Sequence, residues 1–553
     1  MEKRNKKEGG NWGASIFFIA NLLNFVLATA VFTIPFPMHE VGILLGTIIL
    51  AITCFISVVA CTFIIEALAL KNSLLKREKS ILDKAIHENE QEQKDDEGNP
   101  KKDKDEKEDK DRPTFLSKDT LISNLDVDAK KEEEVVKKED LINNVEDNND
   151  NRITEEKERI LPIENDEEDI NDERNDSFYI YKRYEISKLA KILPKAGYFF
   201  VVITIICYLY IGVTSNGIIA GNNLKDIIGK TFKKDMPDYS YHIIVACFFV
   251  ITITIALNNI KHLKKFSMFI MIMRFVIIFL IIGCCIYSMG KYGSAKFKNI
   301  PKFDISNITV MIGNSLFVFM SHHSIPGMVE NFTPQRRLIK LLIVGYFFSL
   351  LFIVFYSYVG LFAFSKPELS CDKNSAFPIA IQSTFSSNFL GLSVVGYIIN
   401  YYPILNVITS GMQLITLRNN ILDAIAGCSP DLAKSLNFAE QTGLSPLLKN
   451  FLFNTIVAIP PITIGLLLQN IQSLMKYFSS ILGFLLMLIV PILVVSGYRN
   501  SFYKRKYKFS NLNRSFLKNK YGSAFIICMS VIIFSLIIFG FVKNTTNKTC
   551  VYE

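Results

Sequence analysis

Long apolar runs separated by short polar loops dominate the chain. A membrane-spanning helix needs about 20 consecutive apolar residues. By that rule the pattern predicts about eleven spans, at residues 15–36, 41–70, 197–220, 241–257, 266–289, 308–327, 338–364, 390–417, 448–468, 475–497 and 523–542. The fourth span is short, and polar residues dilute the sixth. We therefore expect an all-α integral membrane protein.

The first span does not have the pattern of a plain anchor helix. It carries two asparagines one helical turn apart, three consecutive small residues and two prolines, namely Asn21, Asn24, Ala28, Thr29, Ala30, Pro35 and Pro37. Backbone groups freed by such interruptions are tolerated at membrane depth only where they line a cavity. The pattern predicts a discontinuous helix that opens its backbone to a ligand.

The sixth span carries a second interruption. Small residues, polar residues and a proline follow one another along it: Gly313, Asn314, Ser321, Pro326 and Gly327. Spans one and six are the first members of two halves if the chain is a 5+5 inverted repeat plus one helix. Interrupted helices at corresponding positions of two halves point to a binding site near the membrane midplane. The alternative is that glycine and proline are simply frequent in membrane helices.

Residues 71–196 form a long polar insert. They contain 37 acidic and 26 basic residues, whereas the rest of the chain contains 15 acidic and 35 basic ones. Stretches such as KKDKDEKEDK lack aromatic residues and cannot bury enough apolar surface to offset chain entropy. We predict a disordered cytoplasmic insert, with order resuming near Tyr179, where YKRYEISKLAKIL has helical spacing. The insert is either an inert expansion or a regulatory segment that binds a cytoplasmic partner.

The basic residues outside the insert lie in short loops, which indicates contact with membrane lipids and argues against nucleic acid as a partner. The positive-inside rule predicts a cytoplasmic N-terminus at 1–14, transmembrane helices at 15–70 and 197–543, and a non-cytoplasmic C-terminus at 544–553. The loop 499–520 supports this orientation with eight basic residues and no acidic one. The basic start also resembles a signal peptide, but the apolar run after it is long enough for a span.

The ten cysteines give no disulfide framework. No CxxC motif occurs, so we do not expect a structural zinc site. We assign no cofactor apart from a coupling ion, which is either a proton or sodium. The predicted topology puts Cys371 and Cys550 on the same non-cytoplasmic side, where they form either a disulfide or two free thiols.

Ionisable residues inside spans are costly, so each is a functional hypothesis. Glu66 lies one turn from the predicted cytoplasmic end of its span, where snorkelling and a coupling role are both open. For Arg274 an interfacial position is favoured. His322 and His323 would point about 100° apart on a helix, which argues against a shared metal ion. One of them can instead face a water-filled path as a proton relay.

No constellation typical of an enzyme is present. The sequence contains no GxSxG, Walker or HExxH motif and no close carboxylate pair within a span, so no catalytic residue is assigned. Many spans, few buried charges and punctuated helices indicate movement of a cargo across the membrane. A channel would need a continuous polar stripe along one span, whereas the interruptions lie at mid-depth.

The order of these features resembles the amino acid/auxin permease family. Asn21-x-x-Asn24-x-x-x-Ala28-Thr29-Ala30, followed by Ile34-Pro35 and Gly42, resembles the family's first helix, with Ala28 and Ala30 in place of two glycines. FVFMSHHSIPGMVENFTPQRR is similar to the family's sixth helix, YVGLFAF to its seventh, and LNNIKHLKKFS to the loop between its fourth and fifth. The resemblance covers all spans and skips only the insert.

The resemblance implies a LeuT-type fold with discontinuous helices one and six, and alternating-access transport of free amino acids driven by protons or sodium. It implies that an unwound segment at Ala28–Ala30 binds the substrate carboxylate. The implied substrate-binding residues are Asn24, Ala28, Thr29, Ala30, Phe317, Phe319 and Ser321. The residues expected in ion coupling are Asn24, Thr409, Ser410 and His322. Alanines in place of glycines make a close backbone approach harder.

Two alternatives stay open from the sequence. The first is an amino acid sensor that signals through the insert 71–196 instead of a transporter. The second concerns the membrane, which is either that of an acidic vacuole or lysosome-like organelle or the plasma membrane.

Overall fold

The computed structural model divides the chain into two compact units, Met1–Leu74 with Ser177–Glu553, and Leu75–Asp176. It describes residues 12–97, 178–233, 236–257, 260–297, 300–322, 324–329, 332, 335–365, 381–392, 394–428, 446–504, 515 and 520–546. Cys371, Cys550 and His323 lie outside these residues, so the predictions made for them are not addressed by the structure.

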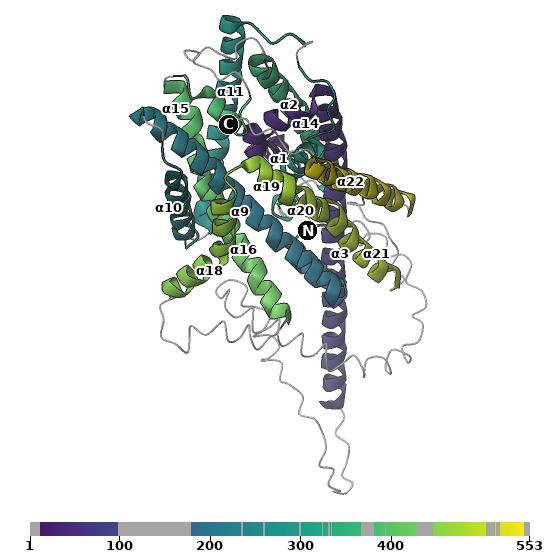
Figure 1. Cartoon of the computed structure of the whole chain (residues 1–553). Helices are drawn as coiled ribbons and strands as arrows, with labels where there is room; N and C mark the ends of the chain where they lie inside the picture. The colour runs from purple at the N-terminus through teal and green to yellow at the C-terminus, as the bar shows by residue number, and fades with distance from the viewer. Residues whose placement is uncertain are drawn as a thin grey trace, which may run out of the picture. The chain divides into compact units, whose positions relative to one another are not determined.

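Helices make up the regular structure of the described residues, and no strand is found among them (Figure 1). The first half contains α1 (Trp12–Thr33), α2 (Pro35–Val41), α3 (Ile43–Glu97), α8 (Ile186–Leu189), η2 (Ala190–Ile192), α9 (Lys195–Phe232), α10 (Tyr239–Ile255) and α11 (Ile260–Tyr292). The second half contains α12 (Ile308–Val318), α13 (Ile325–Val329), η4 (Gln335–Arg337), α14 (Leu338–Phe364), η6 (Phe385–Phe389), α15 (Val394–Tyr401), η7 (Tyr402–Leu405), α16 (Asn406–Cys428), α18 (Pro446–Leu467), α19 (Ile471–Leu474), η9 (Met475–Ser479), α20 (Ser480–Phe484), η10 (Leu485–Ile489), α21 (Val490–Lys504) and α22 (Lys520–Thr546).

Several of these helices can cross a membrane by length and composition. Six qualify on their own: Ile43–Arg77, Lys195–Phe232, Met268–Lys291, Leu338–Phe364, Asn450–Leu467 and Ile471–Lys504. The bent pair Phe18–Thr33 and Pro35–Val41 makes a seventh if it counts as one span, and three shorter apolar helices are Tyr239–Ile255, Ile308–Val318 and Ile526–Val542. The all-helical, multi-pass class is therefore confirmed. The count of eleven helices and the inverted repeat stay predictions.

Helix α9 packs against α10, α16 and α18, and α1 packs against α14 (Figure 1). Buried apolar side chains fill the contact around α9 and α10: Val213, Ala220, Tyr241, Val245, Phe248 and Phe249. Helix α12 packs closely on η9. Gly313 permits this approach, because a Cβ atom there would stand 2.1 Å from the carbonyl oxygen of Met475.

The turn between α2 and α3 explains Gly42, the last residue of the first-span pattern. Its φ of +88° lies in the region that favours glycine, and a Cβ atom would stand 2.5 Å from the carbonyl carbon of Lys302. The amide of Ile43 donates to the carbonyl oxygen of Pro301 at 2.9 Å. The start of α3 is thereby paired with the loop that leads into α12.

Both ends of the predicted disordered insert are folded. Helix α3 continues to Glu97, past the predicted end of its span, and the chain is packed again from Phe178. Phe178 and Ile180 are buried, because FYIY supplies the apolar surface that the charged stretches lack. The helical backbone of residues 71–97 differs from the predicted disorder, whereas the packing from Phe178 begins close to Tyr179, where the sequence predicts that order resumes. Residues 98–177 lie outside the described part of the chain.

Candidate functional site

The first predicted span is discontinuous, but its break lies later than the sequence suggested. Helix α1 ends at Thr33, α2 begins at Pro35, and the two are bent by 60°. The backbone of Ala28, Thr29 and Ala30 is helical, so the unwound segment predicted there is not found in this structure.

Pro35 accounts for the break, because its ring nitrogen has no hydrogen to give to the carbonyl oxygen of Val31, four residues earlier. The hydroxyl of Tyr356 on α14 donates a hydrogen bond to that oxygen at 2.9 Å. Tyr356 and the break residue Ile34 are both buried. A side chain from another helix thus supplies the donor that the first helix lacks.

Pro37 leaves the carbonyl oxygen of Thr33 without a helical donor in the same way. Gln472, at the start of α19, donates from Nε2 to this oxygen at 3.2 Å and to the carbonyl oxygen of Ser383 at 2.7 Å. Its Oε1 accepts a hydrogen bond from Nδ2 of Asn314 on α12 at 2.9 Å. One buried glutamine therefore joins the first break to α12 and to the segment before η6.

The sixth predicted span is also broken, as its sequence predicts. Helix α12 ends at Val318 and α13 begins at Ile325, with a non-helical segment between them. Within that segment the carbonyl oxygen of Phe319 accepts hydrogen bonds from Oγ of Ser57 at 2.7 Å and from the hydroxyl of Tyr346 at 3.2 Å. Side chains of α3 and α14 thus satisfy a carbonyl group that the break sets free.

Tyr346 is the centre of this second break. Its hydroxyl lies 2.5 Å from Oγ of Ser321, 2.9 Å from Oγ of Ser57 and 3.3 Å from Sγ of Cys61. All four residues are buried, and the ring of Tyr346 lies 6.3 Å from that of Phe319. The structure therefore places Phe319 and Ser321 in one cluster with partners from α3 and α14.

Four other predicted site residues lie on α12, in the broken segment and on α16. The ring of Phe317 lies 5.9 Å from that of Tyr208 on α9. His322 is fully buried within the broken segment. On α16, Thr409 is half-buried and Ser410 is buried. The coupling roles of the last three residues stay predictions.

Arg274 is buried within the protein, and only 4% of it is exposed. Its Nη1 donates to the backbone carbonyl oxygen of Asn24 at 2.8 Å and to Oδ1 of Asn24 at 2.5 Å. Its Nε donates to the hydroxyl of Tyr402 at 3.0 Å. Arg274 therefore joins α11 both to α1 and to η7, the turn that leads into α16.

This contact changes the electrostatics at Asn24. The guanidinium group places a positive charge within hydrogen-bonding distance of both oxygen atoms of Asn24. A monovalent cation bound to the same two oxygen atoms would stand about 4 Å away, where like charges repel by about 4 kcal/mol at an effective dielectric constant of about 20. Such a repulsion weakens binding roughly 1000-fold.

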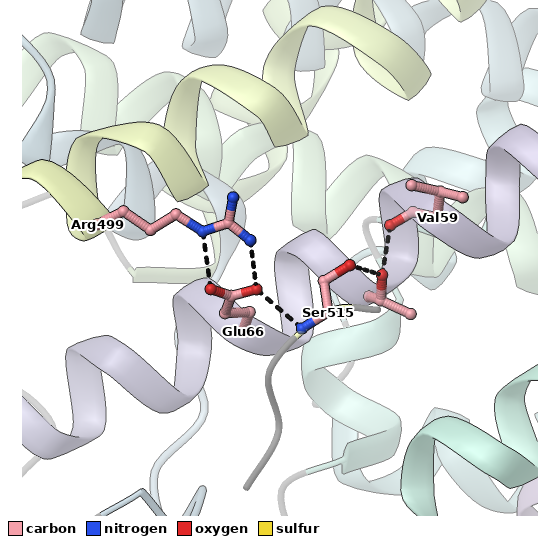
Figure 2. A network of polar contacts seen from close by, with 5 residues as sticks. Val59, Glu66, Arg499 and Ser515 are labelled. Atoms are coloured by element: carbon pink, nitrogen blue, oxygen red, sulfur yellow. Dashed lines mark hydrogen bonds and ion pairs between the residues drawn. The ribbon is translucent and has the colours of Figure 1, made fainter. Parts of the chain in front are cut away.

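Glu66 is fully buried and does not snorkel, because its carboxylate is paired inside the protein. Figure 2 shows Arg499 of α21 donating two parallel hydrogen bonds to it, from Nε to Oε1 at 2.8 Å and from Nη2 to Oε2 at 2.7 Å. The backbone amide of Ser515 also donates to Oε2 at 2.9 Å. The hydroxyl of Ser515 lies 2.7 Å from that of Thr62. The pair ties α3 to α21 and to the predicted cytoplasmic loop, which favours a structural role.

Residues 178–185, which we call the strap, lie in the last part of the insert, directly before α8. Gln335 of η4 accepts from the amide of Ile180 at 2.9 Å and donates to its carbonyl oxygen at 2.7 Å. Asn72 of α3 does the same to Lys182, at 3.0 and 3.1 Å. Two side-chain amides thus hold alternate residues of one extended segment and connect α3 to η4.

The sequence did not single out Tyr346, Tyr356 or Gln472. A signal for such residues exists, because each proline in a span frees the carbonyl oxygen four residues earlier, and a buried donor must reach it. The signal says that a donor is needed, but it does not say which residue supplies it.

Several helices are apolar enough to cross a bilayer, and buried polar side chains donate to the carbonyl oxygens that two helix breaks set free. These features define a multi-pass α-helical membrane protein. A family model described as "Transmembrane amino acid transporter protein" matches residues 168–542. The chain belongs to this family, so its resemblance to amino acid permeases is confirmed.

Several known proteins are similar to the chain. Transmembrane protein 104 homolog of Dictyostelium discoideum is 26% identical over 541 residues, which cover 95% of this chain and 96% of that protein. Transmembrane protein 104 of Homo sapiens is 21% identical over 263 residues, 46% of this chain and 48% of that protein. The crystal structure of MhsT in complex with L-phenylalanine is 13% identical, has a TM-score of 0.38, and is covered over 84% of its length by 65% of this chain.

Proposed function

We propose that the protein is a secondary active transporter that moves amino acids across a membrane by alternating access. The observation that carries the proposal is the pair of helix breaks, at Ile34 and at Phe319–Ser324, in a chain of the amino acid transporter family. Breaks of this kind are the points at which a transporter both binds its substrate and bends. Membrane lipids surround the apolar helices.

The proposed substrate site lies between the first and sixth predicted spans. We assign to it Asn24, the segment Ala28–Ala30, Phe317, Phe319 and Ser321. The backbone at Ala28–Ala30 is helical, so the binding of a carboxylate to its amides requires that this turn opens in another state of the transport cycle. We add Tyr346 and Ser57 to the site, because both donate hydrogen bonds to the freed carbonyl oxygen of Phe319 and would have to release it if a substrate bound there.

For the coupling ion we propose protons in preference to sodium. The guanidinium group of Arg274 beside Asn24 supports this choice, because a sodium ion at Asn24 would meet a fixed positive charge. His322 is the proposed proton carrier, since histidine is the side chain whose charge changes near neutral pH. Thr409 and Ser410 are the proposed polar lining on α16. A proton-coupled transporter suits the membrane of an acidic vacuole or lysosome-like organelle better than the plasma membrane.

The test is a panel of amino acids offered to proteoliposomes that contain the purified protein, under an imposed pH gradient and separately under a sodium gradient. We expect uptake or exchange of at least one amino acid that depends on the pH gradient. The matched variant is His322→Gln, for which we expect loss of pH dependence with exchange at equal pH retained. The absence of gradient-dependent movement for every amino acid would refute the proposal.

A second candidate function is an amino acid sensor that signals through the insert. The strap favours it, because Gln335 next to α14 and Asn72 on α3 both form hydrogen bonds to this segment of the insert. A change at the sixth-span break could then reach the insert through η4. Deleting residues 98–177 leaves the strap in place and separates the two functions. If uptake is unchanged but partner binding is lost, the protein is both a transporter and a sensor. If uptake and signalling are both unchanged, the insert is needed for neither function.

A further inference from the structure

The C-terminal part of α9 holds η6 through two side-chain hydrogen bonds. Oγ of Ser387 donates to Oδ2 of Asp226 at 3.0 Å, and Oγ of Ser386 donates to Oδ1 of Asn223 at 2.9 Å. Asn223 and Asp226 are about one helical turn apart, so they face the same element. The predicted topology puts this end of α9, which follows the third span, on the non-cytoplasmic side. Helix α9 therefore fastens η6 on that side of the membrane.

Two contacts lead from the segment around η6 to the first helix break. The ring of Phe385 lies 5.7 Å from that of Tyr356, whose hydroxyl donates to the carbonyl oxygen of Val31. The carbonyl oxygen of Ser383, shortly before η6, accepts from Nε2 of Gln472, which also donates to the last residue of α1. Both carbonyl groups that the first break sets free are thus bonded to side chains that also contact this segment.

Asp226 is the ionisable member of the contact between α9 and η6. It is half-buried, and among the described residues its carboxylate accepts one hydrogen bond, the one from Ser387. An ionised carboxylate has about four acceptor sites. The adjacent cation, Lys225, is paired with Asp238, whose side chain is 89% exposed. The charged form of Asp226 is therefore only partly compensated while η6 is in place.

A proton on Asp226 removes this cost without removing the contact. Loss of hydration disfavours the charged form of a carboxyl group, and one hydroxyl donor does not replace the water that η6 displaces. The neutral carboxyl group keeps an oxygen atom that accepts from Ser387. When η6 moves away, water solvates the carboxylate again. Protonation therefore favours the docked position of η6, and ionisation favours its release.

The other ionisable groups around this contact come from α9, α10 and α15. On α9 they are Lys225 and Lys230, which donates to backbone carbonyl groups after η6. At the start of α10 they are Asp238 and His242, and on α15 the group is Tyr397, whose ring centroid lies 5.1 Å from Nζ of Lys230. The described residues of η6 and α19 carry none. Histidine is the type of side chain whose charge changes near neutral pH, so His242 is the competing group.

We propose that Asp226 is a proton-responsive positioning residue: a proton that arrives from the non-cytoplasmic side fixes η6 against α9 and thereby holds the first helix break. The proposal rests on the proposed transport function and adds to it a second titratable group, on a different element from His322. This proton does not have to travel with the amino acid. It sets how often the first break is free to rearrange.

The first experiment measures the docking of η6 without transport. Thr384, directly before η6, is buried, whereas Gln382 in the same segment is exposed. The purified full-length protein carries either Thr384→Cys or Gln382→Cys, and mass spectrometry of the peptide that contains the new thiol measures the rate of its labelling by a maleimide. The rate at position 384 is divided by the rate at position 382, which cancels the pH dependence of the thiol itself.

In the otherwise wild-type protein we expect this ratio to rise by about 3- to 10-fold from about pH 5 to about pH 7.5. A group that binds its proton up to about tenfold more tightly in one of two states shifts their equilibrium by at most that factor. Asp226→Asn keeps an acceptor for Ser387 but no charge, so its ratio should be low at every pH. Ser387→Ala keeps the acid but removes the donor, so its ratio should exceed that of the wild type, most of all at the higher pH. His242→Gln is the matched control and should keep the wild-type response.

The second experiment measures uptake in proteoliposomes with the amino acid on the non-cytoplasmic side. The first break can rearrange only while η6 is released, so the apparent affinity falls in proportion to the fraction of protein that is competent to bind. At neutral pH we expect Asp226→Asn to raise KM by about 3- to 10-fold with a smaller change in kcat. His242→Gln should leave both unchanged.

Four results would overturn the proposal. The first is a labelling ratio that does not change with pH in the otherwise wild-type protein. The second is an Asp226→Asn variant that folds but keeps the pH response, or loses it with a high ratio at every pH, since the charged carboxylate would then be what holds η6. If this variant does not fold, a Ser387→Ala variant labelled like the wild type at every pH takes the place of this result.

The third result is loss of the pH response in His242→Gln, and the fourth is an unchanged KM in Asp226→Asn. If the wild type transports no amino acid under any gradient, the proposed function fails, and the labelling ratio still decides whether a proton on Asp226 positions η6.

Discussion

Tyr356 donates its hydroxyl hydrogen to the carbonyl oxygen of Val31 at 2.9 Å, although 325 residues separate them in the sequence. This oxygen is the one that Pro35 leaves without a helical donor. The contact replaces a hydrogen bond within one helix by one between α1 and α14. Any motion that straightens or reopens the first break has to exchange this donor, so the pair is both a structural tie and a point of control.

Replacement of Tyr356 by phenylalanine removes only this donor. We expect a loss of about 1–3 kcal/mol in the free energy of unfolding, because the buried oxygen of Val31 is left unsatisfied. The measurement is chemical or thermal unfolding of the purified protein. The control is Tyr358→Phe on the same helix, whose hydroxyl lies 2.9 Å from that of Thr47, a group that already donates to Ile43. Equal losses in the two variants would contradict the role of Tyr356.

Gln472 serves both the first break and α12, so its replacement by leucine should disturb two places at once. Leucine leaves the oxygens of Thr33 and Ser383 without this donor, and it leaves Asn314 with only the carbonyl oxygen of Val310 as an acceptor. We expect a loss of about 1–3 kcal/mol for each group left unpaired, and a larger fall in uptake than in Tyr356→Phe. Unfolding and uptake are both measured. The exposed Gln469 provides the control, and a Gln469→Leu variant with the same defects would speak against this account.

The two helix breaks show what the sequence could predict and what it could not. The sixth span breaks within the run of small and polar residues, as expected. In the first span the small residues Ala28–Ala30 did not open the helix, because alanine is the best helix former. Pro35 and Pro37 opened it, because they remove donors. A rule based on missing hydrogen bonds would have placed this break correctly.

The contacts of the buried charges were beyond the reach of the sequence. Hydropathy places Glu66 and Arg274 along a span but does not say which face of the helix is covered by protein. Their partners, Arg499 and Asn24, lie far away in the chain and become neighbours only through packing. The sequence predicts that order resumes near Tyr179, within the strap, but it does not indicate that Gln335 and Asn72 hold this segment.

The strap gives a prediction about local stability. Replacement of Gln335 or Asn72 by alanine removes two hydrogen bonds to the backbone of residues 178–185. We expect faster cleavage by trypsin after Lys182 in either variant and less than additive effects in the double variant, because both amides hold the same segment. Mass spectrometry of the fragments measures the rate. In the control, Asn222→Ala, a hydrogen bond between α9 and the residue Gln469 is lost and cleavage at the strap should not change.

In the pair of Glu66 and Arg499, the glutamate side chain is fully buried and the arginine side chain is 20% exposed. We expect Glu66→Gln to cost about 3–5 kcal/mol in the free energy of unfolding, because it leaves an arginine without its counter-charge. The double variant Glu66→Leu with Arg499→Leu should recover much of this loss, since no unpaired charge is then buried.

The control is the exposed pair of Arg183 and Glu185, for which Glu185→Gln should cost only about 0–1 kcal/mol. Unfolding of all variants in one detergent measures the differences. A Glu66→Gln variant as stable as Glu185→Gln would mean that water reaches the Glu66 carboxylate. A double leucine variant less stable than either single leucine variant would mean that the attraction within the pair exceeds the cost of burying its charges.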